Sequence, residues 1–173
     1  MQHANFVHLH CHTQYSLLDG AIRVGDLVNR ASEYRMPAMA VTDHGNMFGA
    51  LEFYSKARAA GVKPIIGCEV YVASGSRHEK SGAASSSDAS GHFILLCKNR
   101  KGYRNLCHMV STAYQDGFYY KPRIDWNLLK ENNEGLIALT ACLGGEIPSL
   151  INRGRMDHAR QRAEEMSRIF DNN

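Results

Sequence analysis

The sequence lacks the features that mark membrane and secreted proteins. It has no apolar run near the roughly 18 residues that a membrane-spanning helix needs, and it shows no signal peptide. Its five cysteines are odd in number and include no CxxC pair, so no disulfide framework is indicated. We therefore expect reduced thiols in a cytoplasmic protein that is not integral to a membrane.

A large excess of one charge is also missing. The formal net charge is +3, which permits a nucleic-acid partner without arguing for one. The 173 residues are 44% hydrophobic and 21% charged, both near ordinary globular values. We expect one soluble domain over residues 1–173, large enough for a real core and without an internal repeat.

Apolar patterning predicts strands that alternate with helices for most of the chain. Strand, helix and strand in succession are typical of a parallel sheet with right-handed crossovers, so the predicted fold class is α/β. The expected strands are Phe6 to Leu9, Ala38 to Thr42, Pro64 to Ala73, His92 to Lys98 and Leu136 to Thr140, and the expected helices are about Val24 to Tyr34, Phe48 to Ala60, Lys101 to Gln115, Asp125 to Asn132 and Met156 to Phe170.

Residues 74–91 interrupt this alternation. The segment is rich in serine, glycine and alanine and has no apolar periodicity, which predicts a flexible surface loop. Without a crossover helix, the strand from His92 should return antiparallel to the strand that ends at Ala73. That return would bring His92 near Glu69.

The segment from Val7 to Thr13 carries the most specific signal. His8, His10 and His12 occupy alternate positions, and alternate side chains of a strand share one face, so they converge on one point. Neutral imidazoles beside a carboxylate, here Asp19 in an Asp-Gly turn, suit zinc, manganese or iron. His8 lies deeper in the strand, which favours a supporting or core position over ligation.

Further ligand-type residues lie at the ends of later strands. His44 follows the second strand, Glu69 lies in the outer half of the third, and Cys142 follows the strand that ends at Thr140. The carboxyl ends of parallel strands are where α/β folds build their sites. Together with His10 and His12, these residues predict one metal centre at that end of the sheet.

Each candidate also has a simpler interpretation. Asp19 before Gly20 is often only a turn, and Cys142 alone is most often a small buried residue. Asp43 should point away from His44 by strand alternation and either support the site or cap the following helix. We expect structural roles for Cys11 and Cys68, and incidental or exposed positions for His3, His78, His108 and His158.

Taken together, these motifs resemble the polymerase and histidinol phosphatase (PHP) domain. The resemblance is carried by His10-Cys11-His12, Asp19-Gly20, Thr42-Asp43-His44-Gly45-Asn46, Gly67-Cys68-Glu69-Val70-Tyr71, Gly91-His92 and Cys142-Leu143-Gly144. More narrowly, Ser16 to Gly20, Gly49 to Tyr54, Gly102 to Leu106, Lys121 to Asp125 and Glu134 to Leu139 resemble the PHP domain at the N-terminus of bacterial replicative DNA polymerase III alpha subunits. The likeness covers essentially the whole chain.

This resemblance implies a distorted TIM-like (β/α)7 barrel that holds two or three divalent metal ions. The implied ligands are His10, His12, Asp19, His44, Glu69, His92 and Cys142. The family completes its site with an Asp-x-His pair on a later strand, and no such pair occurs before Asn173. We therefore expect a domain truncated before its last strands, weakly active or inactive by itself, within a much longer polymerase subunit.

The implied chemistry is metal-assisted phosphodiester hydrolysis, as a 3′ to 5′ exonuclease. Two cations about 3.5 to 4 Å apart would share Glu69 and activate a bridging water. By the resemblance, one ion would be held by His10, His12 and Asp19, neighbouring ions would be served by His44 and Cys142, and His92 would close the cluster. The Cys142 thiolate favours zinc at one position, while oxygen ligands leave room for manganese or magnesium at another. Tyr119, Tyr120, Lys121 and Arg123 are expected to contact DNA or another polymerase domain.

Two other functions remain open from the sequence. The domain could brace the polymerase and a proofreading exonuclease subunit, with metal serving only stability. It could also be a free-standing small-molecule phosphatase such as a histidinol phosphatase, although the polymerase-like segments speak against this. Retained ligands at every matched position favour the hydrolytic hypothesis.

Overall fold

The computed structural model describes residues 3–80 and 90–170 and shows a mixed α/β fold, which confirms the predicted fold class. Its strands follow the order β1-β2-β3-β5, with β4 beside β2, and the sheet is open over these residues. The strands are β1 (Ala38–Val41), β2 (Lys63–Ala73), β3 (Ser90–Cys97), β4 (Arg123–Ile124) and β5 (Leu136–Leu139), and the helices are α1 (Val24–Glu33), α2 (Ala50–Ala59), α3 (Arg100–Gln115), α4 (Trp126–Glu131), α5 (Glu146–Asn152) and α6 (Met156–Phe170).

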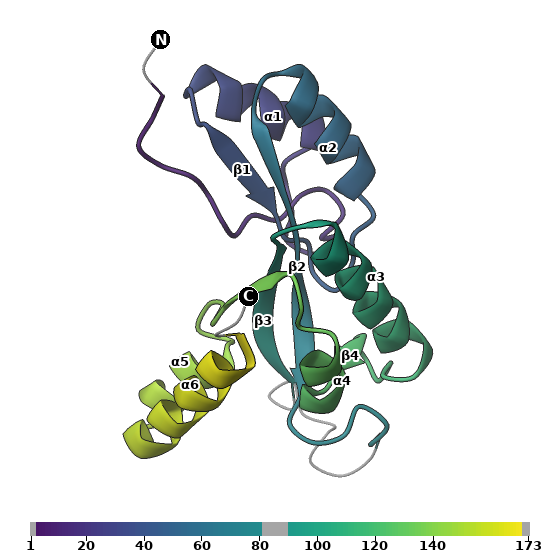
Figure 1. Ribbon diagram of the computed structural model, residues 1–173, viewed down its shortest axis with the longest axis vertical. Helices are drawn as coiled ribbons and strands as arrows, with labels where there is room; N and C mark the ends of the chain where they lie inside the picture. Colours follow the sequence, from purple (N-terminus) through teal and green to yellow (C-terminus); the bar gives the residue numbers. More distant parts are fainter. Residues whose placement is uncertain (1–2, 81–89, 171–173) are drawn as a thin grey trace.

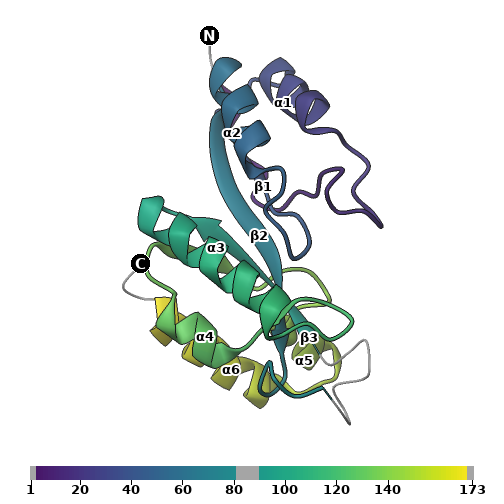
Figure 2. The same cartoon turned by 90° about the vertical axis from the view of Figure 1, so that its right-hand side faces the viewer.

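The long strand β2 joins two halves of the molecule. Its first residues pair in parallel with β1, where Ala38 lies opposite Lys63, and its later residues pair antiparallel with β3, where Glu69 lies opposite Ile94. In Figure 1, β1, α1 and α2 gather at one end of β2, and α3, α4, α5 and α6 gather at the other. Figure 2 shows the same second group from the side, with α3, α4 and α6 labelled.

Side-chain alternation along β2 separates core from site. Cys68, Val70 and Val72 enter the main hydrophobic core, while Glu69 and Tyr71 point to the opposite face. On β3 and β5 that opposite face carries only a small apolar layer. One face of the sheet therefore stabilises the fold, and the other is left for polar side chains.

Local sequence accounts for the helices. The buried stripe of α1 recurs at helical spacing in Val24, Leu27, Val28 and Ala31. The side chain of Asn99 accepts a hydrogen bond from the Gly102 N–H and caps α3. Gly61 takes φ of 74° directly after α2, the left-handed conformation that a glycine adopts at no steric cost. None of the described helices is long and apolar enough to cross a membrane.

The expected elements are confirmed within one or two residues, with one exception. The strand from Phe6 to Leu9 is wrong, because residues 3–23 follow an irregular path beside β1. The backbone carbonyls of His8 and Cys11 accept hydrogen bonds from the N–H groups of Ala40 and Thr42. The three-residue advance from His8 to Cys11 therefore spans only two residues of β1, and this mismatch excludes a regular β-ladder. The sequence pattern also does not predict β4 and α5.

The expected loop at residues 74–91 is only partly described. Residues 74–80 have no regular secondary structure, Ser90 and Gly91 already belong to β3, and residues 81–89 lie outside the described part of the chain. The visible start of the loop is fixed by Arg77, whose guanidinium donates to both carboxylate oxygens of Asp125 at 3.1 and 3.0 Å. As expected, β3 returns antiparallel to β2.

Replacing Asp125 by alanine is expected to lower the free energy of unfolding by about 3 kcal/mol. The change leaves the partly buried Arg77 guanidinium without its carboxylate partner and removes the N-cap of α4. Burial raises the pKa of Asp125, but hydrogen bonds from Arg77 and Leu128 lower it by a larger amount, so the net shift is downward. This contribution should be complete above the unfolded carboxyl pKa of about 3.9 and disappear as the pH falls through the lower folded value.

Urea denaturation at neutral and acid pH checks this expectation. The matched control is Glu134→Ala, which removes an exposed carboxylate 3.8 Å from Lys101 and should change stability by less than about 0.5 kcal/mol. Equal stability of the two variants at neutral pH would contradict the assigned role of Asp125.

Candidate metal centre

Glu69 is the centre of a cluster of imidazoles. Its side chain is 1% exposed, although it carries a carboxylate. Four histidines from different parts of the chain converge on its two oxygens. They are His10 and His12 from the N-terminal segment, His44 after β1, and His92 on β3. A buried carboxylate surrounded by imidazole nitrogens is a donor set suited to divalent transition metals.

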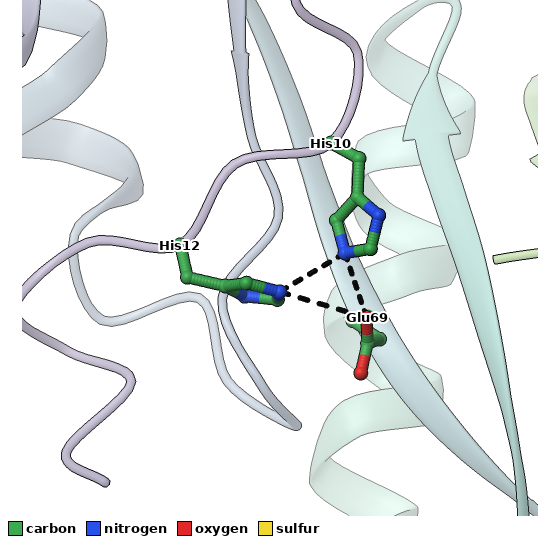
Figure 3. A group of neighbouring side chains, drawn as sticks. All are labelled: His10, His12 and Glu69. Atoms are coloured by element: carbon green, nitrogen blue, oxygen red, sulfur yellow. Dashed lines mark hydrogen bonds and ion pairs between the residues drawn. The ribbon is translucent and has the colours of Figure 1, made fainter. Parts of the chain in front are cut away.

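Two of these histidines form a group with one carboxylate oxygen (Figure 3). The His10 Nε2 lies 2.7 Å from Glu69 Oε2, and the His12 Nε2 lies 3.6 Å from the same oxygen. The two Nε2 atoms are 3.0 Å apart. Three potential ligand atoms thus point into one small volume, as three ligands of a single ion would.

The other carboxylate oxygen faces a second group. Glu69 Oε1 lies 2.7 Å from His92 Nδ1 and 2.8 Å from His44 Nδ1. Cys142 follows β5 and places its Sγ 3.8 Å from His92 Nδ1, so thiol, imidazole and carboxylate form a second set of three. Gly144 packs so closely over the His92 ring that an added Cβ would lie 3.2 Å from Nδ1.

Asp19 extends the cluster toward solvent through His44. The His44 Nε2 lies 2.9 Å from Asp19 Oδ2, and the Asp19 side chain is 58% exposed. The structure therefore brings together all seven expected ligands, and Glu69 lies between the two groups. Their role as metal ligands stays a prediction.

Unpartnered buried atoms support the fit of a metal to these residues. Glu69 Oε1, Glu69 Oε2 and His44 Nδ1 are buried, and among the described residues none makes a hydrogen bond of normal geometry, despite the short distances. Buried polar atoms are rarely left without a partner, since each costs about 1 to 3 kcal/mol. Lone pairs that converge without hydrogen bonds are what a metal site presents.

Electrostatics keep the cluster ready for a cation. Burial raises the pKa of Glu69, but His44 and His92 lower it by a larger amount, so the carboxylate is ionised at neutral pH. Burial, and then the neighbouring His44, lower the pKa of His12, so this ring stays neutral and can act as a ligand. Contact with Glu69 raises the pKa of His44. A metal ion bound at the centre would replace the proton that Glu69 favours on His44.

A buried carboxylate holds the N-terminal segment in place. Asp43 is 1% exposed and accepts hydrogen bonds from the Thr13 N–H at 2.6 Å, the Thr13 hydroxyl at 2.8 Å and the Ser16 hydroxyl at 2.8 Å. The Ser16 hydroxyl in turn accepts from the His44 N–H. These contacts agree with the expected supporting position of Asp43, and they place it under the histidine segment and not at the start of α2.

His8 does not take the buried supporting position that we expected. It is exposed, and its ring packs edge-on against Phe6 at 4.7 Å. Strand alternation fails here because the segment is not a regular strand. Cys11 packs against the core around α1, and Cys68 is fully buried, as expected. His3, His78, His108 and His158 are all exposed.

The segment from Tyr119 to Arg123 divides into structural and exposed parts. Arg123 is 3% exposed and donates to the backbone carbonyls of Gly117, Arg77 and Glu79, so the expected contact with DNA is wrong for this residue. Tyr120 is 77% exposed, and the Lys121 ammonium lies 4.5 Å above the Tyr71 ring.

Tyr71 is a site residue that sequence reasoning missed. Its ring lies 5.2 Å from the His92 ring and 6.2 Å from the His44 ring, and burial raises its pKa to about 12. The signal that could have found it is its position two residues after Glu69, on the same face of one strand. Thr13 and Ser16, which fix Asp43, were also missed.

A buried carboxylate with converging imidazoles, on one face of a mixed α/β sheet, defines an α/β domain with a candidate metal centre. A family model described as "PHP domain" matches residues 8–173, so the chain belongs to the PHP domain family. The predicted resemblance is confirmed by this match.

Known relatives of the chain are much longer proteins. DNA polymerase III subunit alpha of Thermus aquaticus is 52% identical over 167 residues, which are 95% of this chain and 14% of that protein. The subunits of Chlamydia muridarum (strain MoPn / Nigg) and Borreliella burgdorferi are 54% and 46% identical, over 82% and 98% of this chain and 11% and 15% of their own lengths. The chain therefore spans about one seventh or less of these curated relatives.

Proposed function

We propose that this chain is the N-terminal PHP region of a bacterial replicative DNA polymerase III alpha subunit. Identities near 50% to alpha subunits from distant bacteria support this assignment. It makes the remaining domains of that subunit and DNA its partners, with a proofreading exonuclease subunit as a further partner and the cytoplasm as its location. Nucleotide transfer would belong to other parts of the protein.

We further propose that the metal centre hydrolyses phosphodiester bonds at the 3′ end of DNA. The observation that carries this proposal is the buried Glu69 carboxylate, which offers one oxygen to each of two groups of potential ligands. Bound divalent cations would supply an activated water and stabilise the attacking and leaving oxygens. The donor set favours zinc near Cys142 and zinc, manganese, magnesium or iron at the neighbouring positions.

Different residues of the chain would bind the metal, supply charge and position the ligands. His10 and His12 would hold one ion, Glu69 would supply the shared negative charge, and Asp43 fixes the histidine segment without touching substrate. Asp19 and His44 close the solvent side of the centre. Catalytic roles fall to His10, His12 and Glu69.

The test is removal of 3′ nucleotides by the full-length gene product that contains these residues. His12→Ala should reduce release of the terminal nucleotide from a mismatched primer by about 100-fold or more. Loss of a residue that only hydrogen-bonds to a metal ligand lowers activity by about 10- to 100-fold, and loss of a ligand itself should lower it at least as much. Nucleotide incorporation should be unchanged. The matched control His158→Ala, at an exposed position on α6, should retain full activity.

Undiminished nucleotide removal by His12→Ala would contradict the hydrolytic proposal. The bracing hypothesis would then be favoured if the folded full-length protein also bound no metal. A chelator such as EDTA provides an independent check, since it should abolish nucleotide removal and excess manganese or zinc should restore it.

A further inference from the structure

A tight turn at residues 119–122 lies beside the metal centre. The Tyr119 N–H donates to the Lys121 carbonyl at 3.0 Å, and Tyr120 at the tip takes φ of 57°. This left-handed conformation is uncommon for a residue with a side chain. The Tyr120 ring contacts the Tyr119 ring edge-on at 4.6 Å and is otherwise largely exposed. The turn thus carries an exposed aromatic ring next to a lysine.

Two contacts fix the C-terminal side of the turn. Arg123 follows it, pairs with Tyr71 in the β2–β4 ladder and anchors its buried guanidinium on three backbone carbonyls. Pro122 packs against Gly45, where an added Cβ would lie only 2.8 Å from the proline Cγ. Since Gly45 follows the expected ligand His44, the position of the turn is coupled to the geometry of the metal centre.

Lys121 places an ammonium group at the edge of the centre. Its Nζ lies over the face of Tyr71, whose ring in turn contacts the rings of His44 and His92. Within the described part of the chain, Lys121 forms no ion pair with a carboxylate. A cation held by an aromatic face keeps its N–H donors available for an anion.

We propose that Lys121 binds a non-bridging oxygen of the substrate phosphodiester at the metal centre, and that Tyr120 stacks on the base of the adjoining nucleotide. The inference rests on the proposed hydrolytic function and deepens it, because it assigns two side chains that would hold the DNA strand at the metal centre. Lysine is a common phosphate partner, and exposed aromatic rings bind successive bases of single strands without sequence preference. Arg123 has no part in this contact, since it is buried and its Nε and Nη2 donate to backbone carbonyls.

Metal-loaded full-length protein is compared with Lys121→Met and with Lys101→Met, a control at the start of α3 beside Glu134. Lys121→Met should bind thymidine 5′-monophosphate about tenfold more weakly and lower kcat/KM for nucleotide removal by about 100-fold, as loss of one charge-stabilising donor does. Metal content should be unchanged. Lys101→Met should behave as the parent.

Tyr120→Asn separates base stacking from phosphate binding, because asparagine tolerates the left-handed conformation and has no aromatic ring. It should weaken binding of a single-stranded oligonucleotide by about tenfold and leave hydrolysis of bis(4-nitrophenyl) phosphate unchanged.

Three results would overturn the inference: parental mononucleotide binding and turnover by Lys121→Met, loss of metal from that variant, or a parent protein that binds no mononucleotide. A parent that binds the nucleotide through Lys121 but releases no product would refute only the hydrolytic function.

Discussion

The Glu69→Gln variant is expected to lose most of its bound divalent metal and to keep its fold. Glu69 is the residue that both groups of potential ligands share, so one substitution removes a negative ligand from each. The amide is nearly isosteric with the carboxylate but carries no charge, and it can offer only one oxygen. Metal affinity should fall by more than about 100-fold, beyond the loss that follows from changing an outer partner.

Metal content after dialysis, measured with circular dichroism on the same samples, checks this expectation. Glu52→Gln is the matched control, because Glu52 is a half-exposed carboxylate on α2 that contacts Lys56 and Tyr15. It should bind metal as the parent does. Full metal content in a folded Glu69→Gln variant would mean that the ion lies elsewhere.

Asp43→Ala is expected to lower the free energy of unfolding by about 3 kcal/mol, because it leaves a buried N–H and two hydroxyls without their acceptor. The same change should weaken metal binding, since Thr13 directly follows the segment that carries His10 and His12. Asp43→Asn should cost only about 1 kcal/mol. Its amide oxygen can accept from the Thr13 N–H while its NH2 group donates to the Thr13 hydroxyl.

Urea denaturation of the two variants, with and without added zinc, separates the two effects. The gain in stability on adding zinc should be largest for the parent, smaller for Asp43→Asn and smallest for Asp43→Ala, since a ligand stabilises the state that binds it. An Asp43→Ala variant with parental stability and metal affinity would show that the N-terminal segment is held by other contacts.

Much of the site could be predicted because strand geometry acts locally. Alternation along one strand places Glu69 on the face opposite Cys68, and the antiparallel return of β3 brings His92 to it. Both conclusions need only the residues of one strand and one connection. The end of α2 is indicated in the same local way by Gly61, whose left-handed backbone follows the helix.

Other features depend on contacts between residues far apart in sequence. The basic and aromatic segment that contains Arg123 predicted contact with DNA. The Arg123 guanidinium is instead buried, and it donates to backbone carbonyls of residues more than 40 positions earlier. The segment at His8 has the alternation of a strand, yet its register against β1 is irregular. Two-residue β4 and seven-residue α5 are too short for a clear apolar period.

The most direct test of the metal centre is anomalous X-ray scattering from crystals of the full-length protein grown with zinc and manganese. The proposed metal centre predicts anomalous peaks on both sides of Glu69, one bounded by His10 and His12 and the other by His92 and Cys142. Ordered side chains at these positions with no anomalous peak between them, or peaks confined to another part of the protein, would contradict it.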